Sequence, residues 1–381
     1  MVSSVNQPRP LALTDLMRPH PRGMPVTLVL LTLNGVVFAL MLASGGGLLH
    51  AVNEVSLAWG AGFGPATQDH QWWRLFTAMF VHFGVMHLAL NLWALWDIGR
   101  VVERAYGSLR IGGIYVVSGL VGNLASLVVQ GNQAVSGGAS GAIFGLYGAL
   151  VVFLWRERRL IERREFRWVM GASALFPLLM LVFGLWIPEI DNAAHAGGLL
   201  AGALLGCGTA PRWDPGRSTP AYPPWWSGLL LTAGVLALLL CMPDPPYRFG
   251  EEVQARAAIQ RFLQEERKIH QRWDVLMDFR QGEQLSFDQM AEQVDRQITA
   301  AYQQSFAQLS AVQPVSAVPS QQALSELQAY AALRSEAASK LAEGLRAHDQ
   351  EKIDQAMMQA RNAAAQARKS PAQALPAPVS P

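Results

Sequence analysis

The sequence predicts an all-α, polytopic helical membrane protein that carries a soluble helical domain at its C-terminal end. Three observations support this fold class. Only 15% of the 381 residues are charged and 51% are hydrophobic, whereas soluble domains carry about 25% charged residues. Several apolar runs before residue 243 approach the ~20 residues that span a bilayer. The part after residue 243 has no such run and is rich in Gln, Ala, Glu and Arg.

The apolar runs divide the chain into segments. Residues before Pro25 are rich in Pro and Arg and contain no apolar run, which indicates a tail and not a cleavable signal peptide. The expected spans are residues 26–43, 80–102, 111–129, 140–155, 168–187, 192–208 and 225–242. The expected segments are a disordered cytoplasmic tail (1–24), a six-helix membrane domain (25–210), a cytoplasmic linker (211–224), a seventh transmembrane helix (225–242), an extracytoplasmic helical domain (243–370) and a disordered tail (371–381).

The orientation follows from the basic stretch at residues 155–167, after the fourth span. The positive-inside rule places this stretch in the cytoplasm. The N-terminus and the linker then also face the cytoplasm, consistent with their arginines: Arg9, Arg18, Arg22, Arg212 and Arg217. The start of the fourth span and the C-terminal domain face outward. We expect a multi-pass protein of the cell membrane, which is the inner membrane in a Gram-negative cell.

The fourth span opens with a glycine-rich turn, Gly138-Ala139-Ser140-Gly141. Free N–H groups and the helix dipole at a helix N-terminus favour negative charge, which suits a serine that forms a tetrahedral oxyanion. A helix from Ser140 to Leu154 is about 22 Å long at roughly 1.5 Å per residue, so Ser140 would lie below the outer surface of a ~30 Å core. Small-residue clusters of this kind also occur simply for helix packing in membranes.

Polar residues interrupt the other apolar runs at similar depth: His82, His87, Asn91 and His195. Ionisable groups inside spans are expensive and suggest function, although a lone histidine can also be an interhelical contact. Under the orientation above, these residues and Ser140 occupy one layer. They are therefore candidates for one site.

Helical spacing brings small residues onto the same faces as these polar groups. Gly198 and Gly202 share a face with His195, and Gly145 continues the face of Gly141. Two such stripes can pack closely, which would place His195 within hydrogen-bond reach of the serine. A neutral imidazole can then act as general base. Asp191, four residues before His195, is either a third member of the site or a residue that begins the helix, where Asp is favoured; we expect the second.

The order of these motifs resembles the rhomboid intramembrane serine proteases over about residues 70 to 206. The matching motifs are Trp73-Arg74, His82-x4-His87-x3-Asn91, Glu103-x3-Gly107, Gly138-x-Ser140-Gly141 and Ala194-His195-x2-Gly198-x3-Gly202. The resemblance implies a six-helix core and a Ser–His dyad that requires no acid. A seventh span departs from many bacterial relatives, but a six-plus-one layout is familiar in other branches.

The resemblance also implies a role for each matching residue. Ser140 corresponds to the nucleophile and His195 to the general base, while His87, Asn91 and a backbone N–H correspond to the oxyanion donors. Phe144 replaces a tyrosine that stacks on the base, so the ring is kept and the hydroxyl is lost. The residues expected to support the site are His82, Gly138, Gly141, Phe144, Gly198 and Gly202, and the structural ones are Trp73, Arg74 and Glu103.

The C-terminal domain is predicted to be helical. Residues 251–312 read as amphipathic helix with Phe262, Ile269, Trp273 and Leu276 at helical spacing. A Pro/Ser/Val-rich break at 314–319 precedes a helical pair at 321–344 and 348–369. The domain is either a solvated bundle or a module that docks a substrate or partner.

The composition also bears on cofactors and partners. The two cysteines, Cys207 and Cys241, fall near opposite ends of consecutive spans and predict neither a disulfide nor a metal site; we expect no cofactor. The near-neutral net charge of +2 gives no case for nucleic-acid binding. The expected partners are the lipid bilayer and transmembrane protein substrates. A non-catalytic rhomboid-like binding protein is the main alternative, although such relatives typically lack the serine or the histidine. A transporter would be expected to show repeated halves with broken helices, and the sequence shows no internal repeat.

Overall fold

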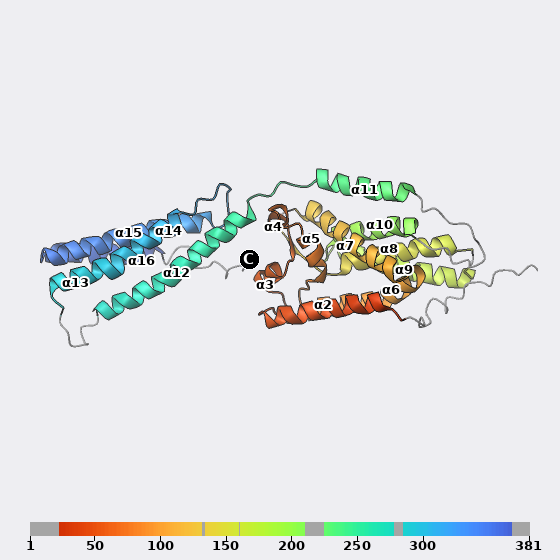
Figure 1. Ribbon diagram of the computed structural model, residues 1–381, viewed down its shortest axis with the longest axis horizontal. Helices are drawn as coiled ribbons and strands as arrows, with labels where there is room; N and C mark the ends of the chain where they lie inside the picture. Colours follow the sequence, from red (N-terminus) through yellow and green to blue (C-terminus); the bar gives the residue numbers. More distant parts are fainter. Residues whose placement is uncertain (1–22, 132–133, 160, 210–224, 278–284, 368–381) are drawn as a thin grey trace, which may run out of the picture. The chain divides into compact units, whose positions relative to one another are not determined.

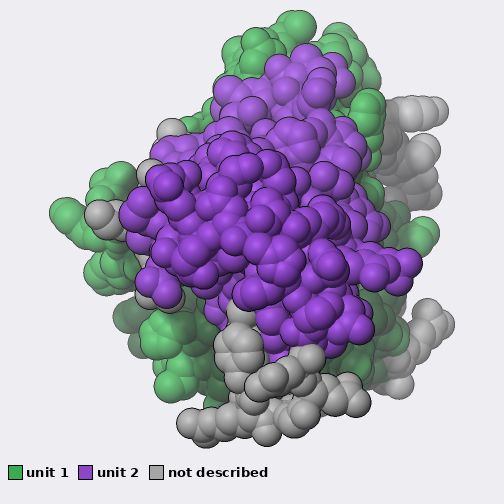
Figure 2. Space-filling view, turned by 90° about the vertical axis from the view of Figure 1, so that its left-hand side faces the viewer, with its two compact units in different colours: residues 1–245, 381 green, residues 246–380 purple. Residues whose placement is uncertain are grey.

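The computed structural model describes residues 23–131, 134–159, 161–209, 225–277 and 285–367 (Figure 1). These residues form two compact units, which Figure 2 colours separately. The first unit comprises the described residues up to 245, and the second comprises those from 246 onward. The expected tails, and the linker at residues 211–224 with Arg212 and Arg217, lie wholly or almost wholly outside the described residues.

A helix of 16 residues or more occupies each of the apolar runs in the first unit. These helices are α2 (Pro25–Ala43), α6 (Val85–Tyr106), α7 (Ser108–Gln130), α8 (Ser140–Glu157), α9 (Arg163–Phe183), α10 (Asn192–Thr209) and α11 (Trp225–Leu240). Among the described residues, α2, α7 and α9 are each long and apolar enough to cross a membrane. The helix α6 and the short helical segment before it, residues 74–80, are long and apolar enough only when they are taken together. The two parts are bent by 92° relative to each other. The chain is therefore a multi-pass membrane protein.

The helices α8, α10 and α11 are not both long enough and apolar enough to meet this criterion for a membrane span, although the sequence predicted a span at each. Leu240 ends α11 after only 16 residues, so α11 counts as a shorter apolar helix. Glycines and a few polar or charged residues dilute the apolar character of α8 and α10. The same glycines allow α8 to pack deep inside the unit, against α6, α7, α9 and α10.

The second apolar run begins its helix later than the sequence predicted. The expected start was residue 80, but α5 (Arg74–Thr77) and the 3-10 turn η1 (Ala78–Phe80) come first, and α6 starts at Val85. Gly84 separates the two parts with a φ of +134°, a conformation that L side chains rarely adopt. A sharp bend therefore stands where a continuous span was expected.

Two short strands connect this region to the turn before α8. The strand β1 (Gly62–Phe63) pairs antiparallel with β2 (Val135–Ser136), and Gly62 lies opposite Ser136. The short helices α3 (Asn53–Ala58) and α4 (Gly64–Gln68) flank β1. The loop that follows α2 is thereby fixed to the segment that leads into Ser140.

Glu103, near the end of α6, ties three helices together. Its carboxylate accepts hydrogen bonds from the N–H groups of Val26 (3.0 Å) and Thr27 (2.8 Å), in the first turn of α2. The Thr27 hydroxyl (2.6 Å) and the hydroxyl of Ser108 at the start of α7 (2.7 Å) complete the set. A carboxylate at a helix N-terminus satisfies free N–H groups and opposes the helix dipole.

The second unit is helical throughout its described part. Its helices are α12 (Phe249–Met277), α13 (Phe287–Val294), the π-helical turn η2 (Asp295–Thr299), α14 (Ala300–Ser310), α15 (Gln321–Arg346) and α16 (Gln350–Ala367). Phe262 and Ile269 are buried in its two apolar cores, and Trp273 and Leu276 pack against the second core.

The expected helix over residues 251–312 is interrupted. A new helix, α13, begins after Ser286, whose side chain accepts a hydrogen bond from the Gln289 N–H. The Gln289 side chain in turn binds the Ser286 N–H, which completes a capping box. The Pro/Ser/Val-rich segment at 314–319 separates α14 from α15, and α15 and α16 form a helical pair.

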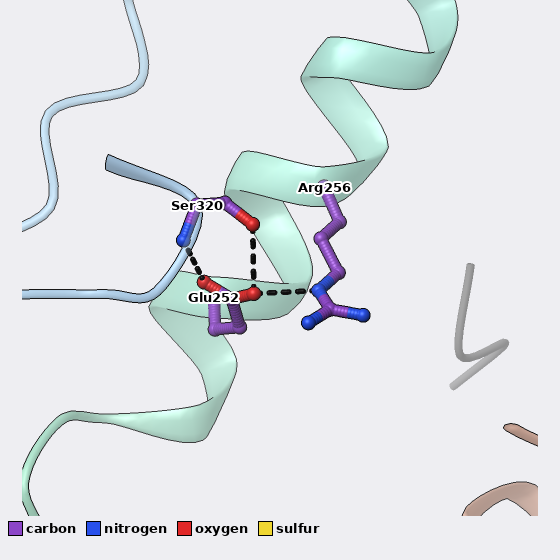
Figure 3. A network of polar contacts seen from close by, with 3 residues as sticks. All are labelled: Glu252, Arg256 and Ser320. Atoms are coloured by element: carbon purple, nitrogen blue, oxygen red, sulfur yellow. Dashed lines mark hydrogen bonds and ion pairs between the residues drawn. The ribbon is translucent and has the colours of Figure 1, made fainter. Parts of the chain in front are cut away.

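Two adjacent glutamates at the start of α12 bind one serine inside that segment and the serine directly after it. Glu252 accepts bonds from the N–H (2.9 Å) and hydroxyl (2.7 Å) of Ser320, and Arg256 binds the same carboxylate (Figure 3). Glu251 accepts the N–H (2.9 Å) and hydroxyl (2.6 Å) of Ser316. Ser316 and Ser320 thus attach the segment to α12.

Candidate active site

The hydroxyl of Ser140 and the imidazole of His195 are hydrogen-bonded. Ser140 is the first residue of α8, and His195 lies in the first turn of α10. The distance from Ser140 Oγ to His195 Nε2 is 2.9 Å, and the imidazole is 7% exposed. A serine hydroxyl at this distance from a ring nitrogen can pass its proton to that nitrogen.

Backbone contact between α8 and α10 sets this distance. A methyl group added at Gly198 would overlap the carbonyl of Gly141, and one added at Gly202 would overlap the backbone of Gly145. The two glycine stripes therefore face each other, as the spacing in the sequence indicated. Helices in such contact are separated by little more than their main chains.

Phe144, one turn after the serine, supports the imidazole. Its ring lies parallel to that of His195, with 4.0 Å between the ring centroids and an angle of 7° between the planes. The Nδ1 atom of His195 is buried and has no hydrogen-bond partner among the described residues. Stacking, and not a bond to an acid, orients the ring.

Asp191 begins α10 and does not bind the imidazole. One carboxylate oxygen accepts the Ala194 N–H (2.9 Å), and the other accepts the hydroxyl of Ser126 in α7. The Asp191 carbonyl accepts the His195 N–H (3.0 Å). Of the two interpretations open from the sequence, the structure supports a residue that caps the helix.

His87 lies against the turn before Ser140. Its Nδ1 accepts the Phe83 N–H (3.3 Å), so the neutral ring carries its proton on Nε2. A methyl group added at Gly138 would come within 2.9 Å of that Nε2. Gly138 has a φ of +126°, which favours glycine, and this close approach needs a residue without a side chain. The ring therefore presents its N–H group to the serine turn.

Asn91 and His82 surround His87. The Asn91 amide donates to the His87 carbonyl (2.9 Å), and its own oxygen is buried without a partner in the described structure. His82 is 1% exposed, and its Nδ1 lies 3.2 Å from the Phe80 carbonyl. The rings of His82 and His87 are 5.1 Å apart between centroids. Asn91 thus holds the backbone of His87, and in the described structure it makes no hydrogen bond to Ser140.

The N-terminus of α8 offers further donors. The first bond within the helix is donated by the Ile143 N–H to the Ala139 carbonyl. The three preceding N–H groups, beginning with that of Ser140, point out of the helix end. The Gly138 N–H donates to the Ala78 carbonyl (2.8 Å), which fixes the turn from the other side.

Trp73 and Arg74 have opposite surroundings. Arg74 is buried and donates to the carbonyls of Leu57 (2.7 Å) and Ala61 (3.0 Å), so it holds the loop before α6 together. Trp73 is half exposed, and the guanidinium of Arg74 lies 4.8 Å from the centroid of its ring.

Sequence reasoning missed the partners of the charged groups. Thr27 and Ser108 bind Glu103, and Ser126 binds Asp191. The sequence signal that could have pointed to Ser126 is that it is a polar residue inside an apolar run. Within the described ranges, no group of three or more His, Cys, Asp or Glu residues could hold a metal ion. Cys207 and Cys241 are free.

The sequence is similar to a known protein family and to several known proteins. Residues 69–212 match the family model described as the rhomboid domain. Over 177 residues the chain is 37% identical to rhomboid protease GluP of Bacillus subtilis (strain 168). The matched region covers 46% of this chain and 33% of GluP. It is 38% identical over 162 residues to RHOMBOID-like protein 5 of Arabidopsis thaliana, which covers 41% of this chain and 50% of that relative. The chain thus spans between a third and a half of the length of these relatives.

Proposed function

The chain contains a rhomboid domain, and from this premise we propose that it is an intramembrane serine protease that hydrolyses peptide bonds in or near transmembrane segments of membrane proteins. One observation carries the proposal: the 2.9 Å hydrogen bond between Ser140 Oγ and His195 Nε2, at the N-terminus of a buried helix. A non-catalytic binding protein would have no need of this pair.

In the proposed mechanism, Ser140 Oγ attacks the carbonyl carbon of the scissile bond while His195 Nε2 takes the hydroxyl proton. The C–N bond then breaks, and His195 returns the proton to the leaving amine. A water molecule attacks the resulting acyl ester and gives a proton to His195. The ester bond to Ser140 breaks, and the proton returns to the serine oxygen.

The oxyanion of the tetrahedral intermediate needs donors beside Ser140. We assign this role to the outward N–H groups of the first turn of α8 and to the Nε2–H of His87; the approach of the His87 ring to the serine turn supports the assignment. We assign Asn91 as a further donor, which requires its amide to leave the His87 carbonyl. The assignment of Asn91 therefore predicts a side-chain rotation when an acyl-enzyme analogue binds.

The proposed orientation keeps the N-terminus and the basic stretch after α8 in the cytoplasm and places the second unit outside. The arginines Arg156, Arg158 and Arg163 at the end of α8 and the start of α9 support it. We propose the cell membrane as the location, and the second unit as either a solvated helical bundle or a module that docks a substrate or partner.

The test is cleavage of a model transmembrane substrate in liposomes, together with labelling of the serine by a fluorophosphonate. The native chain should cut and be labelled, and Ser140→Ala and His195→Ala should do neither while remaining folded. Ser118→Ala is a matched control, because Ser118 is a buried serine in α7 whose hydroxyl has no hydrogen-bond partner among the described residues.

Each outcome is decisive. Cleavage by Ser140→Ala at the native rate would exclude Ser140 as the nucleophile. A native chain that is neither labelled nor active against a panel of substrates would favour the binding protein.

A further inference from the structure

Asp191 stands at the junction of α7 and α10, one turn before the proposed base. Three contacts meet at this residue. Its carboxylate accepts the Ala194 N–H (2.9 Å) and the hydroxyl of Ser126, and its carbonyl accepts the His195 N–H (3.0 Å). Asp191 therefore binds the backbone of the first turn of α10 on one side and α7 on the other.

The surroundings show why this connection matters for His195. The imidazole Nδ1 has no partner in the described structure, so no acid sets its position. The ring position then depends on the stacking with Phe144 and on where the first turn of α10 places the His195 Cα atom. A methyl group at Gly122 in α7 would lie 2.7 Å from the Ala194 carbonyl, so α7 meets that turn with its bare backbone.

We infer that Asp191 is a positioning residue for the reaction: by capping α10 and binding Ser126 of α7, it holds His195 in register with Ser140. The inference rests on the proposed protease function. It assigns no contact with the substrate and no proton transfer to Asp191. An asparagine can make the same two side-chain contacts, because its oxygen can accept the Ala194 N–H and its amide can donate to the Ser126 hydroxyl.

The experiment compares Asp191→Ala, Asp191→Asn and Ser126→Ala with the native chain, with Ser118→Ala as the matched control in α7. The rate of fluorophosphonate labelling at Ser140 is measured first, and kcat and KM for a model substrate second. Misplacement of a catalytic group by about 1 Å can cost a hundredfold in rate. We expect Asp191→Ala to label about 10- to 100-fold more slowly, with kcat reduced and KM changed by less than about twofold.

The conservative variant distinguishes positioning from charge. Asparagine caps helices about as well as aspartate, so Asp191→Asn should keep a near-native labelling rate, and Ser126→Ala should fall between the native chain and Asp191→Ala. An Asp191→Asn variant as slow as Asp191→Ala, or an Asp191→Ala variant as fast as the native chain, would overturn the inference. Ser126→Ala decides the matter if Asp191→Ala fails to fold.

Hydrogen exchange separates this inference from the proposed function. The amides of Ala194 and His195 should exchange faster in Asp191→Ala than in Ser118→Ala, whether or not the chain cleaves a substrate. Unchanged exchange at both amides would refute the anchoring by Asp191. An unlabelled native chain with faster exchange in Asp191→Ala would refute only the protease.

Discussion

The imidazole of His195 lies parallel to the ring of Phe144, with 4.0 Å between the ring centroids. The other ring nitrogen of His195 has no partner among the described residues, so in the proposed mechanism the stacked ring takes the place that an acid fills in a Ser–His–Asp triad. An apolar surface can fix the plane of an imidazole as a hydrogen bond would, without adding a charge inside the membrane.

Replacing Phe144 should therefore impair the reaction. An aromatic pair contributes about 0.5–1.5 kcal/mol beyond its buried area, so Phe144→Ala should lower kcat by roughly 2- to 10-fold, where 1.4 kcal/mol is a factor of ten. Phe144→Tyr keeps the ring and should retain activity. The rate of fluorophosphonate labelling measures the effect, and a native rate in Phe144→Ala would show that stacking does not orient the base.

Substitution of the glycines between α8 and α10 should lower stability. Gly198→Ala forces a methyl group into the carbonyl of Gly141, and overpacking of this kind costs about 1–3 kcal/mol. Gly171 in α9 has open space around it, so Gly171→Ala should be neutral or stabilise by up to about 1 kcal/mol. Thermal unfolding in detergent compares the two variants. Equal Tm values would contradict the close backbone contact.

Glu103 should be a structural residue with a large effect. Glu103→Ala removes the acceptor of four hydrogen bonds and leaves the N–H groups of Val26 and Thr27 without their partner. The expected loss in the free energy of unfolding is about 2 kcal/mol or more. Asp97→Ala is the control, because Asp97 forms an exposed ion pair with Arg100, worth at most about 1 kcal/mol. Similar losses of Tm in both variants would argue against the role of Glu103.

The attachment of residues 314–319 to α12 should depend on pH. The Ser316 hydroxyl and N–H, which donate to Glu251, hold the pKa of its carboxyl below the ordinary value. A pKa that is lower in the folded state stabilises the fold above the unfolded-state pKa of about 4.3. This stabilisation is lost as the pH falls through the lower folded-state value.

Hydrogen exchange at the Ser316 amide can follow this loss. The protection factor should fall as the pH is lowered below about 4, and Glu251→Gln should abolish this dependence. A protection factor that is independent of pH in the native chain would mean that the Glu251 carboxylate does not hold Ser316.

The sequence allowed prediction of the helices of the first unit because hydrophobic runs of membrane helices are long. It did not reveal the bend between Phe80 and Val85, because the residues around Gly84 are about as apolar as those of a membrane helix. Only the backbone conformation marks the break. The π-helical turn at Asp295–Thr299 likewise has no signal in the amphipathic pattern.

The pairing of Ser140 with His195 was predictable because the glycine stripes have helical spacing and the polar groups share one depth. The direction of the Asn91 amide was not, because a side chain with both donor and acceptor can bind its own helix or a neighbour. The hydroxyl partners of Glu103 were not predictable either. Thr27 is far from Glu103 in the sequence, and a helix end separates Ser108 from Glu103. Many other serines and threonines of the chain lie in similar sequence surroundings.

The proposed nucleophile and its proposed base are 55 positions apart in the chain. A ribosome adds roughly 5–20 residues per second, so several seconds pass between the synthesis of Ser140 and that of His195. During this interval the nascent chain contains Ser140 but not yet His195, the residue that binds its hydroxyl. The sixth long helix, α10, carries the proposed base, so the Ser140–His195 pair can form only after that helix has been made.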